Sequence, residues 1–272
     1  MPKTEINSLC FFCYNEYMNI SAPQNIIELL TELSSNLQKI LKDNLVGIYV
    51  HGSLAMNCFN YQTSDIDILV ITAGVVPMPK RREIADILIM LTPKAPPKGF
   101  EISIVSQDNL KSLTYPMPYE FHFSNGYIEK YKDADADLDT IGKTDADLVA
   151  HLVTTKARGV TLFGKPIDEV IPDVPRQDYL DSISRDAKEI LANISSNPVY
   201  NVLNLCRVWA YKKDGLVTSK LEGGEWAIEL ASATQKAIIN QALDEYKNNI
   251  KKQWDSNSLN QFGSEISQIF EL

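Results

Sequence analysis

The sequence lacks an excess of basic residues. Lys and Arg total 26 against 35 for Asp and Glu in a chain of 272 residues, so the formal net charge is −9. A protein whose main partner is a nucleic acid usually carries a positive surface that neutralises the phosphates. The composition therefore argues against a nucleic-acid partner and favours a cationic one.

Long apolar runs are missing as well. The longest apolar stretch, 66–78, is interrupted by Asp67, Thr72, Gly74 and Pro77, and it is too short to span a bilayer. The first residues also lack the apolar core and the small-residue cleavage site of a secretory signal. We therefore expect no membrane partner and a cytoplasmic location.

Cysteine is scarce, and only Cys10 and Cys13 form a C-x-x-C pair. A zinc site would need two further ligands, but Cys58, Cys206 and three scattered histidines offer no local pair. We interpret Cys10 and Cys13 as small apolar residues of an N-terminal extension, residues 1–22, in a protein of a reducing compartment.

The first half of the chain mixes strand and helix patterns. Apolar residues recur at helical spacing over 23–43 and 80–90. Short alternating or β-branched runs predict strands over 45–50, 66–72 and 100–105. This half therefore has the pattern of an α/β (α+β) domain.

The second half contains helical patterns alone. Gly and Pro cluster at 162–166 and 172–175, where the periodicity lapses. Beyond them, helical spacing recurs over 180–191, 202–211, 226–230, 237–246 and 259–270. We predict one domain over residues 1–170 and an all-α helical bundle domain over residues 171–272.

Two carboxylates stand at alternate positions where the second predicted strand begins. A period of two places Asp65 and Asp67 on one face of that strand, and Glu101 can add a third carboxylate from another strand. Adjacent anions repel, and hard oxygen ligands suit Mg²⁺, which shares its coordination shell with substrate phosphates. Upstream, Gly52 permits close backbone approach to a ligand, and Ser53 offers a hydroxyl and an N–H to phosphate. The pattern predicts a metal–nucleotide site.

The G-S pair followed by a loop and D-x-D resembles the nucleotidyltransferase fold of DNA polymerase beta and of many small transferases. Further motifs resemble the streptomycin/spectinomycin adenylyltransferases of the aminoglycoside nucleotidyltransferase family; they are His51-Gly-Ser, Phe100-Glu-Ile-Ser-Ile-Val, Tyr115-Pro, Leu162-Phe-Gly, Leu205-Cys-Arg-Val-Trp, Gly215-Leu-Val-Thr-Ser-Lys and Glu225-Trp-Ala. The resemblance covers almost the whole chain beyond residue 25. It implies a nucleotidyltransferase domain with a mixed sheet, followed by a helical C-terminal domain.

The resemblance also implies roles for individual residues. Asp65 and Asp67, joined by Glu101, would hold Mg²⁺, and Glu101 would act as general base on the acceptor hydroxyl. The nucleotide, ATP, would be bound by residues of both domains, namely Gly52, Ser53, Ser64, Arg207 and Lys220. Each residue has a structural alternative: Glu101 as an exposed strand position, Arg207 as the partner of a helix-surface acid, and Lys220 as a solvated first-turn residue.

The acceptor side departs from the family pattern. Members that modify both drugs carry a Trp in a G-E-W motif, and acidic residues before the helix that bears the arginine. Here Tyr127 is the nearest aromatic residue, and Asn193 and Asn197 stand where the acids are expected. We take these three as the candidate substrate residues, and their identity argues against streptomycin. The loop before Ser64 also has Asn57 and Cys58 in place of paired glycines.

An acidic stretch suits a polycationic substrate. It contains six aspartates, namely Asp133, Asp135, Asp137, Asp139, Asp145 and Asp147. Such a stretch attracts a cation at low ionic strength. Alternatively, Thr144 caps a helix that runs to Lys156, and the acids of its first turn complement the helix dipole.

These observations lead to one expected function and two alternatives. We expect AMP transfer from Mg-ATP to a hydroxyl of spectinomycin or streptomycin, with release of pyrophosphate and resistance to the antibiotic. The protein would be a monomer or weak homodimer. The alternatives are a nucleotidyltransferase with a lincosamide or protein acceptor, and a non-catalytic nucleotide-binding module.

Overall fold

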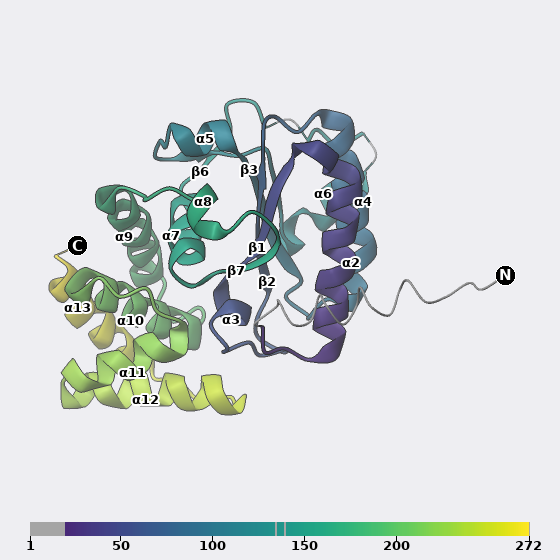
Figure 1. Cartoon of the computed structure of the whole chain (residues 1–272). Coiled ribbons are helices and arrows are strands. Elements are labelled where there is room, and N and C mark those ends of the chain that lie inside the picture. Colours follow the sequence, from purple (N-terminus) through teal and green to yellow (C-terminus); the bar gives the residue numbers. More distant parts are fainter. Residues whose placement is uncertain (1–19, 134, 139, 272) are drawn as a thin grey trace. The chain divides into compact units, whose positions relative to one another are not determined.

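The computed structural model describes residues 20–133, 135–138 and 140–271, and the chain divides into two compact units after Asp173 (Figure 1). The predicted fold class is confirmed, because the first unit combines a mixed sheet with helices and the second is built from helices. Cys10, Cys13 and the extension up to residue 19 lie outside the described residues, as does Asp139.

A five-stranded sheet in the order β5-β3-β2-β1-β7 forms the centre of the first unit. Strands β2 and β3 are parallel, and the other neighbours are antiparallel. A separate pair, β4 and β6, is antiparallel. The strand bounds are β1 Leu45–Val50, β2 Ile66–Thr72, β3 Phe100–Ser106, β4 Met117–Pro118, β5 Phe121–Phe123, β6 Thr144–Asp145 and β7 Val160–Gly164.

The main apolar core of the first unit lies on one face of the sheet. On this face, alternate residues of β2, such as Ile66, Ile68 and Val70, are fully buried in a core shared with α2 (Gln24–Leu41) and α4 (Met78–Leu91), which lie together over the sheet (Figure 1). Burial of each such side chain stabilises the fold by about 1.5–3 kcal/mol. If β2 shifted its pairing by one residue, the Asp67 side chain would enter this core. The apolar residues of β2 therefore fix its register, and this register directs Asp67 to the opposite face.

Shorter helices complete the first unit. Helix α7 contacts both β2 and α3, which places it near the face that carries Asp67. The remaining helices are α3 Gly52–Ala55, α5 Gln107–Lys111, α6 Ile128–Lys132, α7 Leu148–Arg158 and α8 Ile167–Val170, with 3-10 turns at Lys42–Asn44, Thr92–Lys94 and Asn125–Tyr127.

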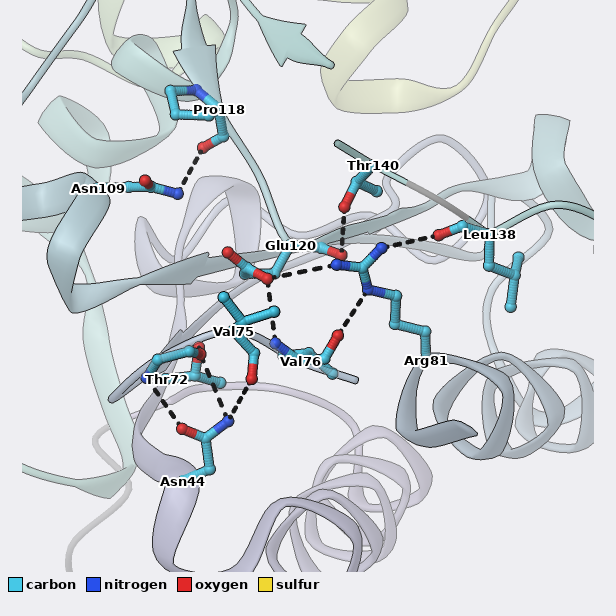
Figure 2. A network of polar contacts seen from close by, with 11 residues as sticks. Asn44, Thr72, Val75, Val76, Arg81, Asn109, Pro118, Glu120, Leu138 and Thr140 are labelled. Carbon is cyan, nitrogen blue, oxygen red and sulfur yellow. Dashed lines mark hydrogen bonds and ion pairs between the residues drawn. The ribbon is translucent and has the colours of Figure 1, made fainter. Parts of the chain in front are cut away.

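A buried arginine ties the acidic stretch to α4, as Figure 2 shows. The Arg81 side chain donates from Nε to the Val76 carbonyl and from Nη1 to the Leu138 carbonyl, at 2.8 and 3.1 Å. Its Nη2 lies 3.5 Å from Oε2 of Glu120, which also accepts from the Val76 amide. Only 6% of the Arg81 side chain and 9% of the Glu120 side chain are exposed. This pair therefore anchors the chain around Leu138.

The second unit contains the helices that the sequence pattern predicts. Their bounds are α9 Arg176–Ala192, α10 Pro198–Asp214, α11 Lys220–Leu230, α12 Ala233–Asn248 and α13 Ser256–Phe270. Local sequence explains several ends: Ser219 and Ser232 form capping boxes with residues three positions on, and Gly215 ends α10 in a left-handed conformation. Among the described residues, none of the helices has both the length and the apolar content that a membrane crossing requires.

One local prediction is wrong. Thr144 does not cap a helix, because Thr144 and Asp145 form β6 and pair with Met117–Pro118. Helix α7 begins at Leu148, and Asp147 occupies its N-cap position. The Asp147 amide donates to Oδ1 of Asp145 at 2.8 Å, so the two acids form a turn between β6 and α7.

Candidate active site

The three candidate carboxylates lie together on the side of the sheet away from the main apolar core. The parallel pairing of β2 with β3 sets Asp67 directly opposite Glu101. Asp65 immediately precedes β2, two residues from Asp67. One carboxylate oxygen from each residue lies within 4.8 Å of the other two, and all three residues are half-buried. The predicted cluster is therefore formed by strand alternation and strand pairing.

This cluster fits a divalent cation. Three carboxylates in so small a space repel one another, and partial burial strengthens that repulsion. All three donors are hard oxygen atoms, the type that Mg²⁺ prefers. Asp65, Asp67 and Glu101 are thus the described residues best arranged to hold the predicted metal.

The turn after β1 packs directly against this cluster. The His51 amide donates to the Asp67 carbonyl at 3.1 Å, and the chain then turns into α3. Gly52 has φ +62°, and a Cβ at this position would meet the Asp67 carboxylate. The close approach of the backbone to Asp67 therefore requires glycine at position 52. This reason is separate from the predicted approach of the backbone to a ligand.

Ser53 presents a hydroxyl that no described residue satisfies. Its Oγ is buried and has no hydrogen-bond partner among the described residues. An unsatisfied buried hydroxyl costs about 1–3 kcal/mol, and water, an ion or a ligand can supply the missing partner. This hydroxyl fits the predicted contact with a nucleotide phosphate, whose oxygens accept hydrogen bonds.

Ser64 has a structural contact in addition to its predicted role. It is buried, and its Oγ accepts a hydrogen bond from the Asn60 amide at 3.1 Å. The Ser64 amide donates to the Asn60 carbonyl at 2.8 Å, which closes the turn before β2. Earlier in the loop, Asn57 takes φ +54°, a left-handed conformation that Asn tolerates better than most residues.

The sequence pattern gives no sign that His122 and His151 belong to this site. His151 of α7 places Nε2 3.9 Å from Oε1 of Glu101, and its ring centroid lies 5.0 Å from that of the buried His51. On the other side, Nδ1 of His122 lies 3.0 Å from the Ser103 hydroxyl. The sequence predicts that Glu101 and Ser103 share one face of a strand, because they are two residues apart. It does not predict which residues of other elements lie beside them.

The predicted substrate residue Tyr127 belongs to an aromatic group beside His122. The Tyr127 ring lies 5.3 Å from the His122 ring and 5.4 Å from the Tyr131 ring. Tyr119 meets His122 edge-on at 6.3 Å. Burial raises the pKa of Tyr119 and of Tyr131 above the ordinary tyrosine value, with Tyr127 adding to both shifts.

Two of the predicted acids also lie near His122. Burial lowers the pKa of His122, while the charges of Glu101, Asp145 and Asp147 oppose that shift. Asp145 further raises the pKa of Tyr119. Both acids therefore act electrostatically on His122, and Asp145 acts on Tyr119 as well.

In the second unit, Arg207 and Lys220 lie around the start of α11. Arg207 donates from Nε to the Thr218 carbonyl at 2.9 Å and from Nη1 to Oδ1 of Asn204 at 3.0 Å. Both acceptors are neutral groups, so these contacts do not support the alternative in which Arg207 pairs with a helix-surface acid. Lys220 is the first residue of α11, and its Nζ lies 4.7 Å from the Tyr200 ring centroid.

The remaining predicted substrate residues flank the turn between two helices of the second unit. Asn193 follows α9, and Asn197 occupies the N-cap position of α10. Both are exposed. Their backbone carbonyls accept hydrogen bonds within the turn, from Asn201 Nδ2 to Asn193 at 3.2 Å and from the Asn201 amide to Asn197 at 2.9 Å.

Comparison with known proteins agrees with the family resemblance. Residues 169–267 match the family described as aminoglycoside adenylyltransferase, C-terminal domain. Spectinomycin 9-adenylyltransferase of Staphylococcus aureus is 25% identical over 233 residues, which cover 80% of this chain and 85% of that protein. Aminoglycoside (3'') (9) adenylyltransferase of Klebsiella pneumoniae is 26% identical over 230 residues, covering 80% and 84%.

A solved structure shares the fold. The crystal structure of a spectinomycin adenylyltransferase from Enterococcus, determined with ATP and spectinomycin, matches with a TM-score of 0.75 at 20% identity. The match covers 90% of this chain and 99% of that one. The resemblance to aminoglycoside adenylyltransferases and the predicted fold class are therefore confirmed.

Proposed function

Residues 169–267 match the aminoglycoside adenylyltransferase C-terminal domain family, and from this premise we propose that the chain transfers AMP from ATP to a hydroxyl of an aminocyclitol antibiotic. Relatives named as spectinomycin 9-adenylyltransferases cover most of the chain and support this acceptor class. The reaction would confer resistance by altering a hydroxyl of the drug. A cytoplasmic location, where ATP is available, accords with it.

Glu101 is the proposed general base. The acceptor oxygen forms a bond to the α-phosphorus of ATP as its proton passes to the Glu101 carboxylate. The bond between the α-phosphorus and the bridging oxygen breaks, and pyrophosphate leaves with that oxygen. A carboxylate can accept a proton from a hydroxyl that lies within hydrogen-bond reach, which is the role of a general base.

Asp65 and Asp67, with Glu101, would hold Mg²⁺. The bound metal would supply positive charge to the triphosphate as negative charge develops on the leaving group. Ser53 would donate its unsatisfied hydroxyl to a phosphate oxygen, next to the Gly52 backbone. Ser64, Arg207 and Lys220 remain predicted nucleotide contacts.

The proposed acceptor is spectinomycin rather than streptomycin. Tyr127, Asn193 and Asn197 are the candidate contacts, and the two asparagines lack the charge that acids at these positions would offer to a cationic drug. Asp145 and Asp147 supply negative charge near His122 instead, and Asp145 also acts on Tyr119.

The observation that carries the proposal is the pairing of Asp67 with Glu101 on parallel strands, with Asp65 alongside. Its test is pyrophosphate release from Mg-ATP with spectinomycin, streptomycin and a lincosamide as acceptors. We expect turnover with spectinomycin, and a loss of about 10²–10⁴ in kcat for Glu101→Gln. Glu129→Gln is the matched control, since the Glu129 side chain is 85% exposed and pairs with Lys132 at the surface.

Each outcome of this test is informative. Turnover with streptomycin would contradict the proposed selectivity. Turnover with the lincosamide alone would show that the acceptor is a lincosamide and not an aminocyclitol. Binding of ATP without turnover on any of these acceptors would overturn the proposal that the chain adenylylates an antibiotic. It would favour a nucleotide-binding module or an enzyme with a protein acceptor.

A further inference from the structure

His122 is held in place beside the candidate base. Ser103 follows Glu101 by two residues on β3, so both project from the same face of the sheet, away from the main apolar core. The antiparallel pairing of β3 with β5 sets Ser103 opposite His122. The Ser103 hydroxyl, in a residue that is 1% exposed, lies 3.0 Å from Nδ1 of His122. The imidazole is therefore oriented by a buried group that stands next to Glu101 on the same strand.

The apolar core of the first unit does not account for a histidine at this position. The flanking residues Phe121 and Phe123 are 1% and 0% exposed and belong to the hydrophobic core on the opposite face. His122 alternates away from that core and is half-buried. Among the described residues, its Nδ1 has a hydrogen-bond partner and its Nε2 has none. The nitrogen that Ser103 does not contact is available to a ligand.

The groups around His122 match a cationic polyol. The rings of Tyr119 and Tyr127 approach the imidazole edge-on, at 6.3 and 5.3 Å. The charges of Asp145, Asp147 and Glu101 act on His122. Aromatic rings and carboxylates together favour an ammonium group, while an imidazole nitrogen adds one directional hydrogen bond.

We propose that His122 determines acceptor specificity through a hydrogen bond from its Nε2 to a polar group of the acceptor next to the reacting hydroxyl. This inference rests on the proposed adenylyl transfer and extends it, since it assigns the acceptor to the side of Glu101 that faces β5. Ser103 is a positioning residue that fixes the imidazole through Nδ1. Asp145 and Asp147 provide the charge that attracts the acceptor's ammonium group.

Two substitutions separate the roles of the two ring nitrogens. An asparagine amide reaches about as far as Nδ1 and a glutamine amide about as far as Nε2, so His122→Asn keeps a partner for Ser103 and His122→Gln keeps a group for the acceptor. We expect the spectinomycin KM to rise about 10-fold or more in His122→Asn, which corresponds to the loss of one hydrogen bond. In His122→Gln, we expect it to recover to within about 3-fold of the wild-type value.

The ATP side of the reaction provides the internal control. The KM for ATP, and the affinity for Mg-ATP measured by calorimetry without acceptor, should change less than about 2-fold in both variants. Thermal unfolding of both variants checks that they fold. Equal spectinomycin KM values in wild type and His122→Asn would overturn the inference and leave the proposed function standing. Absence of turnover by the wild-type protein on every acceptor would overturn both.

Discussion

The side chain of Asp67 occupies the space that a Cβ at position 52 would need. Gly52 takes φ +62°, and a Cβ there would meet the Asp67 carboxylate and its carbon. The turn after β1 and the carboxylate on β2 therefore fit together only if residue 52 has no side chain. This contact links a backbone requirement to the geometry of the candidate metal site.

Gly52→Ala should disturb that site more than it disturbs the fold. A side chain in the left-handed region costs about 1–2 kcal/mol, and here the methyl group also displaces Asp67. We expect kcat/KM to fall about 10-fold or more, as measured by pyrophosphate release. Gly142→Ala is the matched control, because Gly142 has φ +73° and, apart from its chain neighbours, no heavy atom of the described residues lies within 4 Å of the place that its methyl group would take. Wild-type activity in Gly52→Ala would contradict the argument.

Asp65→Asn should separate charge repulsion from metal binding. Without Mg²⁺, removal of one of three clustered carboxylates should leave the variant at least as stable as the wild type. With saturating MgCl₂, the wild type should gain stability through binding to the folded state, and the variant should gain much less. Thermal unfolding with and without the salt measures both effects. Equal stabilisation of the wild type and the variant would argue against the site, and the exposed Asp43→Asn serves as a control.

Replacement of Arg81 by Met should be strongly destabilising. It would leave Glu120 buried without its cation and would remove the hydrogen bonds to the Val76 and Leu138 carbonyls (Figure 2). Breaking a buried ion pair from one side costs about 3–5 kcal/mol in free energy of unfolding. The adjacent Lys80→Met should cost less than about 1 kcal/mol, since the side chains of Lys80 and its partner Glu83 are 35% and 47% exposed. Urea unfolding of both variants measures the loss in free energy of unfolding. Equal losses in the two variants would contradict the prediction.

Tyr49 should make stability fall at alkaline pH. Burial, with a smaller contribution from Glu169, raises the pKa of Tyr49 from 10.0 to about 12. Because the folded state favours the neutral phenol, this stabilisation is fully present below pH 10 and is lost as the pH rises through about 12. The hydroxyl also donates to the Lys165 carbonyl at 2.9 Å.

Urea unfolding of Tyr49→Phe across this pH range tests the prediction. Below pH 10, the variant should be less stable by about 1 kcal/mol or more because it lacks the hydrogen bond. Between pH 10 and 12, the stability difference from wild type should shrink by up to about 1.4 kcal/mol per pH unit. A difference that stays constant with pH would contradict the shift. Tyr61→Phe, at an exposed tyrosine, is the control.

The sequence is sufficient for the elements whose pattern is local. Alternation over 66–72 and 100–105 predicts the two strands that carry Asp67 and Glu101, because one face of each must enter an apolar core. Helical spacing likewise predicts the helices of the second unit. The acidic cluster follows from these local patterns and from the family resemblance.

Local sequence patterns do not predict which distant segments of the chain come into contact. His122 reaches the site because β5 pairs with the outer edge of β3, and His151 reaches it because α7 packs near β2. Neither pairing has a local signature, so both histidines look isolated in the sequence. The prediction for Thr144 is wrong for the same reason, since its partner Pro118 is far away in the chain.

The strand pairing of Asp67 with Glu101 also has a dynamic consequence. Both residues are members of a backbone ladder inside a five-stranded sheet, with β2 as its central strand. Ladder amides in such positions exchange with solvent only when the whole cooperative unit opens. Deuterium uptake at β2 and β3 should therefore follow global unfolding of the first unit, and the backbones of Asp67 and Glu101 should keep their spacing whether or not substrates are present. Ligands then encounter a strand pair that is already assembled.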